Sequence, residues 1–167
     1  MNDHDFQGDP GPAASGVAGP SLDAAPGARV ALEVGGCTLD RLPSFSDPRG
    51  RLLPLEKDRG LPFAPARIFS VYDVRPDAIR GEHAHLACEQ FLYVLGGSVS
   101  VIVDDGRRRA EVTLDHPTIG LHIPPRVWGV QHRFSPGAVL MVAASMSYDP
   151  GDYVYDYQQF LALARAA

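Results

Sequence analysis

Two histidines set two residues apart, His83 and His85, are the side chains best suited to chemistry in this sequence. Alternate side chains of a β-strand share a face, so both imidazoles are expected to point the same way. Arg80 precedes them and adds a fixed positive charge. Imidazole titrates near neutral pH, so such a pair can take a proton as a base and return it as an acid. The alternative, two polar residues on a solvent-facing strand edge, does not account for the neighbouring arginine.

The same stretch also fits the first half of a metal-binding pattern, H-x-H-x3-E-x6-G. Glu89 follows His85 by four residues, and Gly96 follows seven residues later. Two histidines and a carboxylate could hold iron, manganese or zinc. The second half of the pattern requires another histidine after a Pro-x-Gly, but Trp128 stands near that place and His132 comes late. We therefore predict neither a metal nor another cofactor.

The elements that must position these side chains are short strands. Runs rich in β-branched and aromatic residues recur every 8–12 residues with Gly, Pro and Asp between them, which is typical of a sandwich or barrel. Residues 67–74 form one such run, and residues 92–106 indicate a β-hairpin hinged at Gly96 and Gly97. Residues 156–165 have the spacing of one amphipathic helix. Paired histidines in a small all-β chain predict a cupin-type jelly-roll barrel with a short C-terminal helix.

The chain divides into a tail and one domain. Gly, Pro and Ala dominate residues 1–28, a segment with too little apolar surface to offset its ordering entropy. We expect this tail to be disordered or loosely packed, and residues 29–167 to form the domain.

Composition narrows the class of partner. The formal net charge is −5 and no Lys/Arg stripe occurs, which argues against nucleic-acid binding. The sequence contains no run of 18 apolar residues and no secretory signal, so no membrane contact is expected. Cys37 and Cys88 lack metal-type spacing and are interpreted as reduced thiols of a cytoplasmic protein.

Several distinctive blocks are spread over residues 39–163: Asp47-x-Arg49-Gly50, Leu61-Pro62-Phe63, Arg67-x-Phe69-x-Val71-Tyr72, Arg80-Gly81-x-His83-Ala84-His85, Gln90-Phe91-Leu92, Ile123-Pro124-Pro125-x-x-Trp128, Asp152-Tyr153 and Asp156-Tyr157-x-x-Phe160. In this order they resemble the sugar-nucleotide 3,4-ketoisomerases, the dTDP-4-keto-6-deoxyhexose isomerases of deoxysugar pathways. Three positions depart from that pattern: Leu86 replaces a basic residue, Tyr155 an arginine, and Gly129 a larger polar residue.

The resemblance implies metal-free cupin homodimers that exchange N-terminal strands. It implies that His83 and His85 carry the proton transfers, with Arg80 near the substrate. We further predict that the dTDP-linked sugar is bound by Tyr72, Arg67, Gln90 and Trp128. Alternative predictions for single residues are core packing for Trp128, core packing or proton donation for Tyr72, and a weaker place in the site for His122.

The function predicted from these features is isomerisation, which moves the ketone of a dTDP-4-keto-6-deoxyhexose from C4 to C3 through an enediolate. Spacing alone does not order the two histidines, but we favour His83 as the base at C3 and His85 as the second proton carrier or its orienter. Arg80 would stabilise the oxyanion or bind the diphosphate. The alternatives are a cupin epimerase acting at C3 and C5, a metal-dependent dioxygenase, and a sugar-binding module without turnover.

Overall fold

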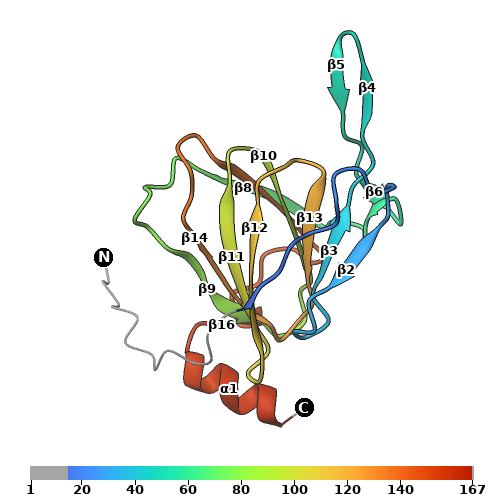
Figure 1. Ribbon diagram of the computed structural model, residues 1–167. Helices are drawn as coiled ribbons and strands as arrows, with labels where there is room; N and C mark the ends of the chain where they lie inside the picture. Colours follow the sequence, from blue (N-terminus) through green and yellow to red (C-terminus); the bar gives the residue numbers. More distant parts are fainter. Residues whose placement is uncertain (1–14, 167) are drawn as a thin grey trace.

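Two six-stranded sheets packed face to face form the body of the protein in the computed structural model, which describes residues 15–166 (Figure 1). The strands of the first sheet are, in spatial order, β1 (Ser15–Gly16), β12 (Arg109–Leu114), β11 (Val99–Asp104), β14 (Trp128–His132), β9 (Arg80–His85) and β16 (Tyr153–Val154). Those of the second are β2 (Arg29–Ala31), β3 (Thr38–Arg41), β13 (Ile119–Ile123), β10 (Gln90–Gly96), β15 (Val139–Ala144) and β8 (Arg67–Tyr72). This is the all-β, cupin-like architecture that the strand rhythm predicted.

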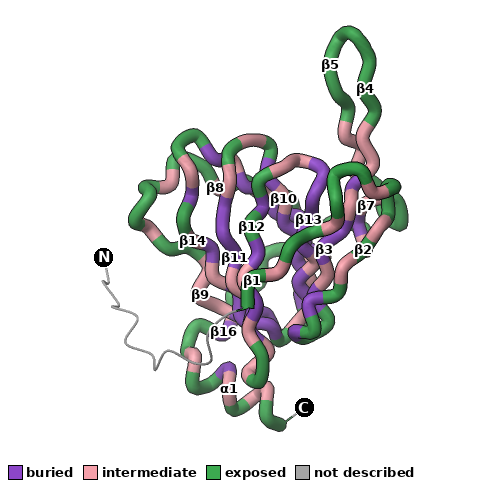
Figure 2. The backbone as a smooth tube through the Cα atoms, in the orientation of Figure 1, coloured by how far each residue is buried: buried purple, intermediate pink, exposed green. Residues whose placement is uncertain are grey.

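The core lies between the two sheets (Figure 2). Alternate residues of β11 and β12 face inward, and they meet apolar side chains from β10, β13 and β15 of the other sheet. The innermost side chains, almost without solvent contact, are Leu92, Val94, Val99, Val101, Val103, Leu114, Leu121 and Leu140. Burying aliphatic side chains from water supplies most of the free energy that holds such a sandwich together.

Gly96 and Gly97 do not hinge a β-hairpin, contrary to the prediction. β10 pairs with β13 and β15, whereas β11 pairs with β12 and β14 in the other sheet. The chain therefore crosses from one sheet to the other at these glycines. Gly97 has a φ of +67°, and a Cβ at this position would lie 2.6 Å from the Cα of Ala138. Apolar residues on both sides of the turn are compatible with either arrangement, so the sequence pattern did not separate them.

The one α-helix among residues 15–166, α1 (Tyr157–Arg165), begins where the sequence predicts. Asp156 is its N-cap and accepts a hydrogen bond from the backbone N–H of Gln159. The helix packs on the outer face of the first sheet, where Tyr157 and Phe160 contact Trp128. The Tyr157 hydroxyl donates to Asp104, which also pairs with Arg109. None of the helices in the described residues is long and apolar enough to cross a membrane.

Two smaller strand pairs lie between β3 and β8 in the chain. β4 (Phe45–Asp47) and β5 (Gly50–Leu52) form a hairpin that projects from the body, at the end opposite α1 (Figure 1). β6 (Glu56–Lys57) and β7 (Gly60–Leu61) form a two-residue parallel pair near its root. The strand predicted over residues 51–56 is therefore interrupted, and Pro54 lies in the interruption.

Part of the predicted tail lies against the barrel. β1 pairs with β12, and Val17 packs on the core. The carbonyl of Leu22 accepts hydrogen bonds from the Arg41 guanidinium, although most residues of this stretch are exposed. The ordered part of the chain thus begins before residue 29, because backbone pairing holds a segment with few apolar side chains. The prediction of disorder for residues 1–14 falls outside the described residues.

Candidate active site

His83 and His85 both face the interior between the sheets, as the strand alternation predicted. Their ring centroids lie 5.0 Å apart with the rings nearly perpendicular. β9 reaches them through an irregular stretch: Gly81 and Glu82 have positive φ, and the pairing of β9 with β14 shifts register there. The two rings line a small cavity of about 10 Å³, together with Cys88, Gln90, Ile123, Pro124, Val127, Gly129 and Gln131. That volume admits about one water molecule, so a hexose must approach from outside it.

His85 is oriented by Asp152, a residue that the sequence reasoning did not single out. Its Nδ1 lies 2.8 Å from Oδ2 of Asp152, and both side chains are buried. A carboxylate only accepts hydrogen bonds, so the neutral imidazole donates from Nδ1 and carries its lone pair at Nε2. The amide Nε2 of Gln90 lies 3.0 Å from that atom. His85 is therefore held as a base at Nε2, with a carboxylate behind it to stabilise the imidazolium.

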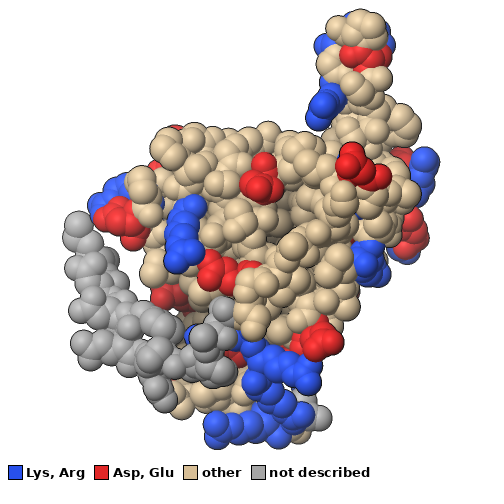
Figure 3. All heavy atoms as spheres, viewed as in Figure 1, with Lys and Arg blue, Asp and Glu red and all other residues tan. Residues whose placement is uncertain are grey.

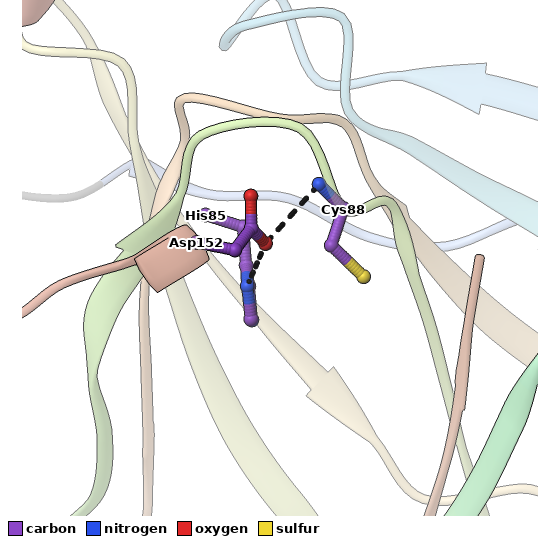
Figure 4. A group of neighbouring side chains, drawn as sticks. All are labelled: His85, Cys88 and Asp152. Carbon is purple, nitrogen blue, oxygen red and sulfur yellow. Dashed lines mark hydrogen bonds and ion pairs between the residues drawn. The ribbon is translucent and has the colours of Figure 1, made fainter. Parts of the chain in front are cut away.

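The Asp152 carboxylate is fixed by backbone as well as by His85. Its Oδ1 accepts from the N–H of Ala87 at 2.7 Å, and its Oδ2 accepts from the N–H of Cys88 at 3.3 Å (Figure 4). Asp152 ends a short 3₁₀-helix, Pro150–Asp152, and its carbonyl accepts from the N–H of Leu86. The turn after β9 thus wraps the carboxylate. The Asp152-Tyr153 block of the family resemblance was the signal in the sequence that could have identified it.

His83 has a neutral partner instead. Its Nδ1 lies 2.9 Å from the carbonyl oxygen of Gly81, which only accepts, so its Nε2 also carries a lone pair. Burial lowers the pKa of His83 below 6.5, although its hydrogen bond to Gly81 opposes this shift. The positive charge of Arg67, and that of His85 whenever His85 is protonated, lower the His83 pKa further. Burial likewise lowers the pKa of His85, although Asp152 opposes this shift. Both imidazoles are therefore neutral bases at pH 7.

Arg67 is the cation at this site. It begins β8, the edge strand of the second sheet, and its Nη2 donates to the Tyr153 hydroxyl at 3.3 Å. Its guanidinium lies over the rings of Phe69 and Tyr148. The Nε of Arg67 is buried and has no hydrogen-bond partner among residues 15–166. A buried donor without a partner is rare in folded proteins, so this atom is an unusual feature of the site.

Aromatic rings surround the open side of the histidine pair. Tyr153 of β16 lies directly across from His85 in the ladder, with ring centroids 4.4 Å apart. Tyr155 stacks on Tyr153 at 5.4 Å and lies 5.8 Å from His83. Tyr155, a departure from the family pattern, thus belongs to the mouth of the site.

The structure does not bring three of the predicted site residues into the cavity. Arg80 is exposed at the start of β9. Tyr72 is 60% exposed because it lies on the outward face of β8. Trp128 is buried under α1, because β14 turns Gly129 and Gln131 inward and their neighbours outward. Gln90, by contrast, lines the cavity, and Arg67 reaches the Tyr153 hydroxyl beside it; their roles in binding stay predictions.

The donor set for a metal differs from the one in the sequence pattern. Glu89 pairs with His122 at 2.8 Å rather than joining the two histidines. Among the described residues, His85, Cys88 and Asp152 offer ligand atoms within 4.8 Å of one another. Both carboxylate oxygens already accept hydrogen bonds, and the thiol of Cys88 points away from Asp152 (Figure 4). Asp152 and the residues that hydrogen-bond to it are therefore arranged to orient the imidazole of His85.

Comparisons with known proteins agree on one family. The family model described as "FdtA: WxcM-like, C-terminal" matches residues 35–165. A curated relative, the TDP-4-oxo-6-deoxy-alpha-D-glucose-3,4-oxoisomerase of Aneurinibacillus thermoaerophilus, is 43% identical over 114 residues, which are 68% of this chain and 82% of the relative.

Similar solved structures point to the same family. A 3,4-ketoisomerase from Helicobacter canadensis is 37% identical with a TM-score of 0.75, covering 77% of this chain and 97% of that one. The 3,4-ketoisomerase QdtA from Thermoanaerobacterium thermosaccharolyticum, solved as a mutant with TDP-4-keto-6-deoxyglucose, is 32% identical with a TM-score of 0.76, covering 78% and 94%. With its paired histidines on β9 and the family model spanning most of its length, the chain belongs to the FdtA family.

Proposed function

We propose that this protein is a 3,4-ketoisomerase that moves the ketone of a TDP-linked 4-keto-6-deoxyhexose from C4 to C3. The observation that carries the proposal is the pair of neutral, inward-facing imidazoles in a chain 43% identical to a TDP-4-oxo-6-deoxyglucose 3,4-oxoisomerase. Isomerisation moves one hydrogen between carbons, from C3 to C4, and one between oxygens, from O3 to O4. Two separate proton carriers suit that requirement.

The two histidines differ in the group that is hydrogen-bonded to Nδ1, and we use this difference to assign their roles. His85 has a buried carboxylate at Nδ1, so the imidazolium formed when it takes the C3 proton is stabilised. His83 has only a carbonyl there. We therefore assign His85 as the base that takes the proton from C3 and returns it to C4, which reverses the order favoured by the sequence. His83 receives the proton of the O3 hydroxyl.

Arg67 takes the role that the resemblance implied for Arg80. Its charge lies close enough to lower the pKa of both histidines. Its guanidinium donates to the Tyr153 hydroxyl beside the histidine pair, so its positive charge would favour the negative charge that develops on the substrate oxygen at C4. Preorganised donors aimed at such an oxygen typically account for about 10²–10³-fold in rate.

A homodimer that exchanges N-terminal strands is also proposed, and the β4–β5 hairpin supports it. All six residues of its strands are exposed, including Phe45 at 57% and Leu52 at 64%. Charges of both signs occur near the hairpin tip (Figure 3), with Asp47 paired to Arg49. A hollow of about 810 Å³ that includes Phe45 and Leu61 opens at its root. An isolated two-stranded hairpin is marginally stable in water, so a second copy is its natural support. A cytoplasmic location stays a prediction.

The direct test is incubation with TDP-4-keto-6-deoxyglucose in D2O, with the product identified by NMR. We expect a 3-keto sugar with deuterium at C4, provided that His85 exchanges its proton with solvent during turnover. His85→Asn keeps a polar side chain of similar reach but cannot act as the base, so kcat should fall by at least about 100-fold. TDP binding, measured by calorimetry, should change little.

Other outcomes would identify other functions. Deuterium at C3 or C5 with the ketone still at C4 would indicate an epimerase. Activity abolished by a chelator and restored by a metal would indicate that the histidines are ligands. Binding of the sugar nucleotide by the folded wild-type protein without any conversion would contradict the proposal.

A further inference from the structure

Tyr153 lies in the site without a role in the proton transfers described so far. It faces the same interior as His85, because the two residues are directly paired between β16 and β9. Its ring centroid is 4.4 Å from that of His85 and 5.0 Å from that of His83. The side chain is half-buried. Its phenol is therefore within reach of any molecule that contacts both histidines.

The hydrogen bond from Arg67 defines what this phenol can do. A guanidinium only donates, so the Tyr153 oxygen is the acceptor of the 3.3 Å contact with Arg67 Nη2. The proton of the hydroxyl remains available for a second acceptor. A fixed positive charge beside the oxygen also stabilises the phenolate that would remain after the proton is given up. Phenol and guanidinium together thus form a unit that can protonate an oxyanion.

The proposed reaction leaves one such step without a donor. His85 accounts for the hydrogen that moves from C3 to C4, and His83 for removal of the proton from O3. The oxygen at C4 begins as a ketone and ends as a hydroxyl, so it must gain a proton. The described residues around the two histidines offer one hydroxyl bonded to a cation, that of Tyr153.

We infer that Tyr153 is a further catalytic residue, the general acid that protonates the C4 oxygen, with Arg67 holding its phenolate. This inference rests on the proposed ketoisomerase function. As His85 takes the C3 proton, the C–H electron pair forms the C3=C4 double bond, and the carbonyl pair takes the Tyr153 proton. His83 then removes the O3 proton, the C3 ketone forms, and the double-bond pair takes the proton from His85 at C4. Transfer of a proton from His83 to the Tyr153 phenolate, directly or through solvent, restores the starting state.

The experiment compares Tyr153→Phe with Tyr148→Phe in the NMR assay. Both changes keep the ring and remove one hydroxyl. Tyr148 lies against Tyr153 and under Arg67, but its hydroxyl has no hydrogen bond to any of residues 15–166. We expect kcat of Tyr153→Phe to fall by about 100-fold or more while KM changes less than about threefold. Tyr148→Phe should stay within about threefold of wild type.

A second arm changes the ring without removing the hydroxyl. Site-specific replacement of Tyr153 by 3-fluorotyrosine keeps a proton donor beside Arg67, so most of the kcat lost in Tyr153→Phe should be retained. Near-wild-type kcat of Tyr153→Phe, or a loss in the 3-fluorotyrosine variant as large as that in Tyr153→Phe, would overturn the inference while wild-type turnover keeps the proposed function intact. No turnover by the wild type would overturn the proposed function first.

Discussion

One buried carboxylate, Asp152, distinguishes two histidines that look equivalent in the sequence. It fixes the tautomer of His85 and opposes the lowering of its pKa, whereas His83 has a carbonyl in the same place. Such a carboxylate acts through the imidazole and does not itself take the substrate proton. Asp152 is therefore a positioning residue.

Replacing Asp152 by Asn should reduce kcat by about 10²–10⁴-fold with little loss of TDP binding. The wild-type activity should decline as the pH falls below 6.5, because burial lowers the pKa of both histidines and protonation removes the bases. Without the carboxylate the His85 pKa falls further, so the acid limb of the kcat/KM profile should move to lower pH. A purely structural role for Asp152 would lower activity without moving that limb. Asp156→Asn is the matched control, since Asn is an equally good N-cap.

The sequence predicted the histidine pair but not its partners, for a physical reason. The 83/85 spacing is local, and strand alternation alone places both rings on one face. Asp152 is 67 residues from His85, and only the sheet pairing brings it there. Trp128 packs under α1, in agreement with its alternative prediction as a core residue, and aromatic character alone did not decide between packing and binding. The positions of proline and glycine in the sequence indicated where strands end.

At the scale of elements, the crossover between β10 and β11 decides which strands share a sheet. The local pattern of residues 92–106 fits a hairpin and a crossover equally well, so the pairing of these strands is decided by the rest of the chain. The crossover needs a glycine at position 97, where the backbone is left-handed and the chain runs close to Ala138.

Gly97→Ala should therefore destabilise the protein by at least about 2 kcal/mol, measured by denaturant unfolding. Gly137→Ala is the control, because Gly137 has a φ of +72° but open space where its Cβ would lie. That variant carries the backbone penalty alone, about 1 kcal/mol. Equal losses for the two variants would show that the close approach at Gly97 relaxes without cost.

At the scale of the whole molecule, the projecting β4–β5 hairpin carries the proposal of a dimer. Replacing Phe45 and Leu52 together by Ser removes its exposed apolar side chains while keeping the turn at Asp47. Sedimentation at micromolar concentration should show a dimer for the wild type and a shift toward monomer for the variant. Leu95 is also exposed, at 54%, but it lies outside the hairpin, so Leu95→Ser should leave the dimer intact. A wild-type monomer would contradict the proposal.

The site joins the edge strands of both sheets, since Arg67 begins β8 and Tyr153 belongs to β16. These two residues are 86 positions apart in the chain, and the hydrogen bond between them forms only when the two sheets have closed on each other. Contacts between such distant segments are generally slow to form. Recovery of enzymatic turnover after dilution from denaturant should therefore lag behind recovery of β-sheet circular dichroism. Enzymatic activity would then report the last stage of folding. Relatives with other residues where β8 meets β16 would differ in refolding rate more readily than in equilibrium stability.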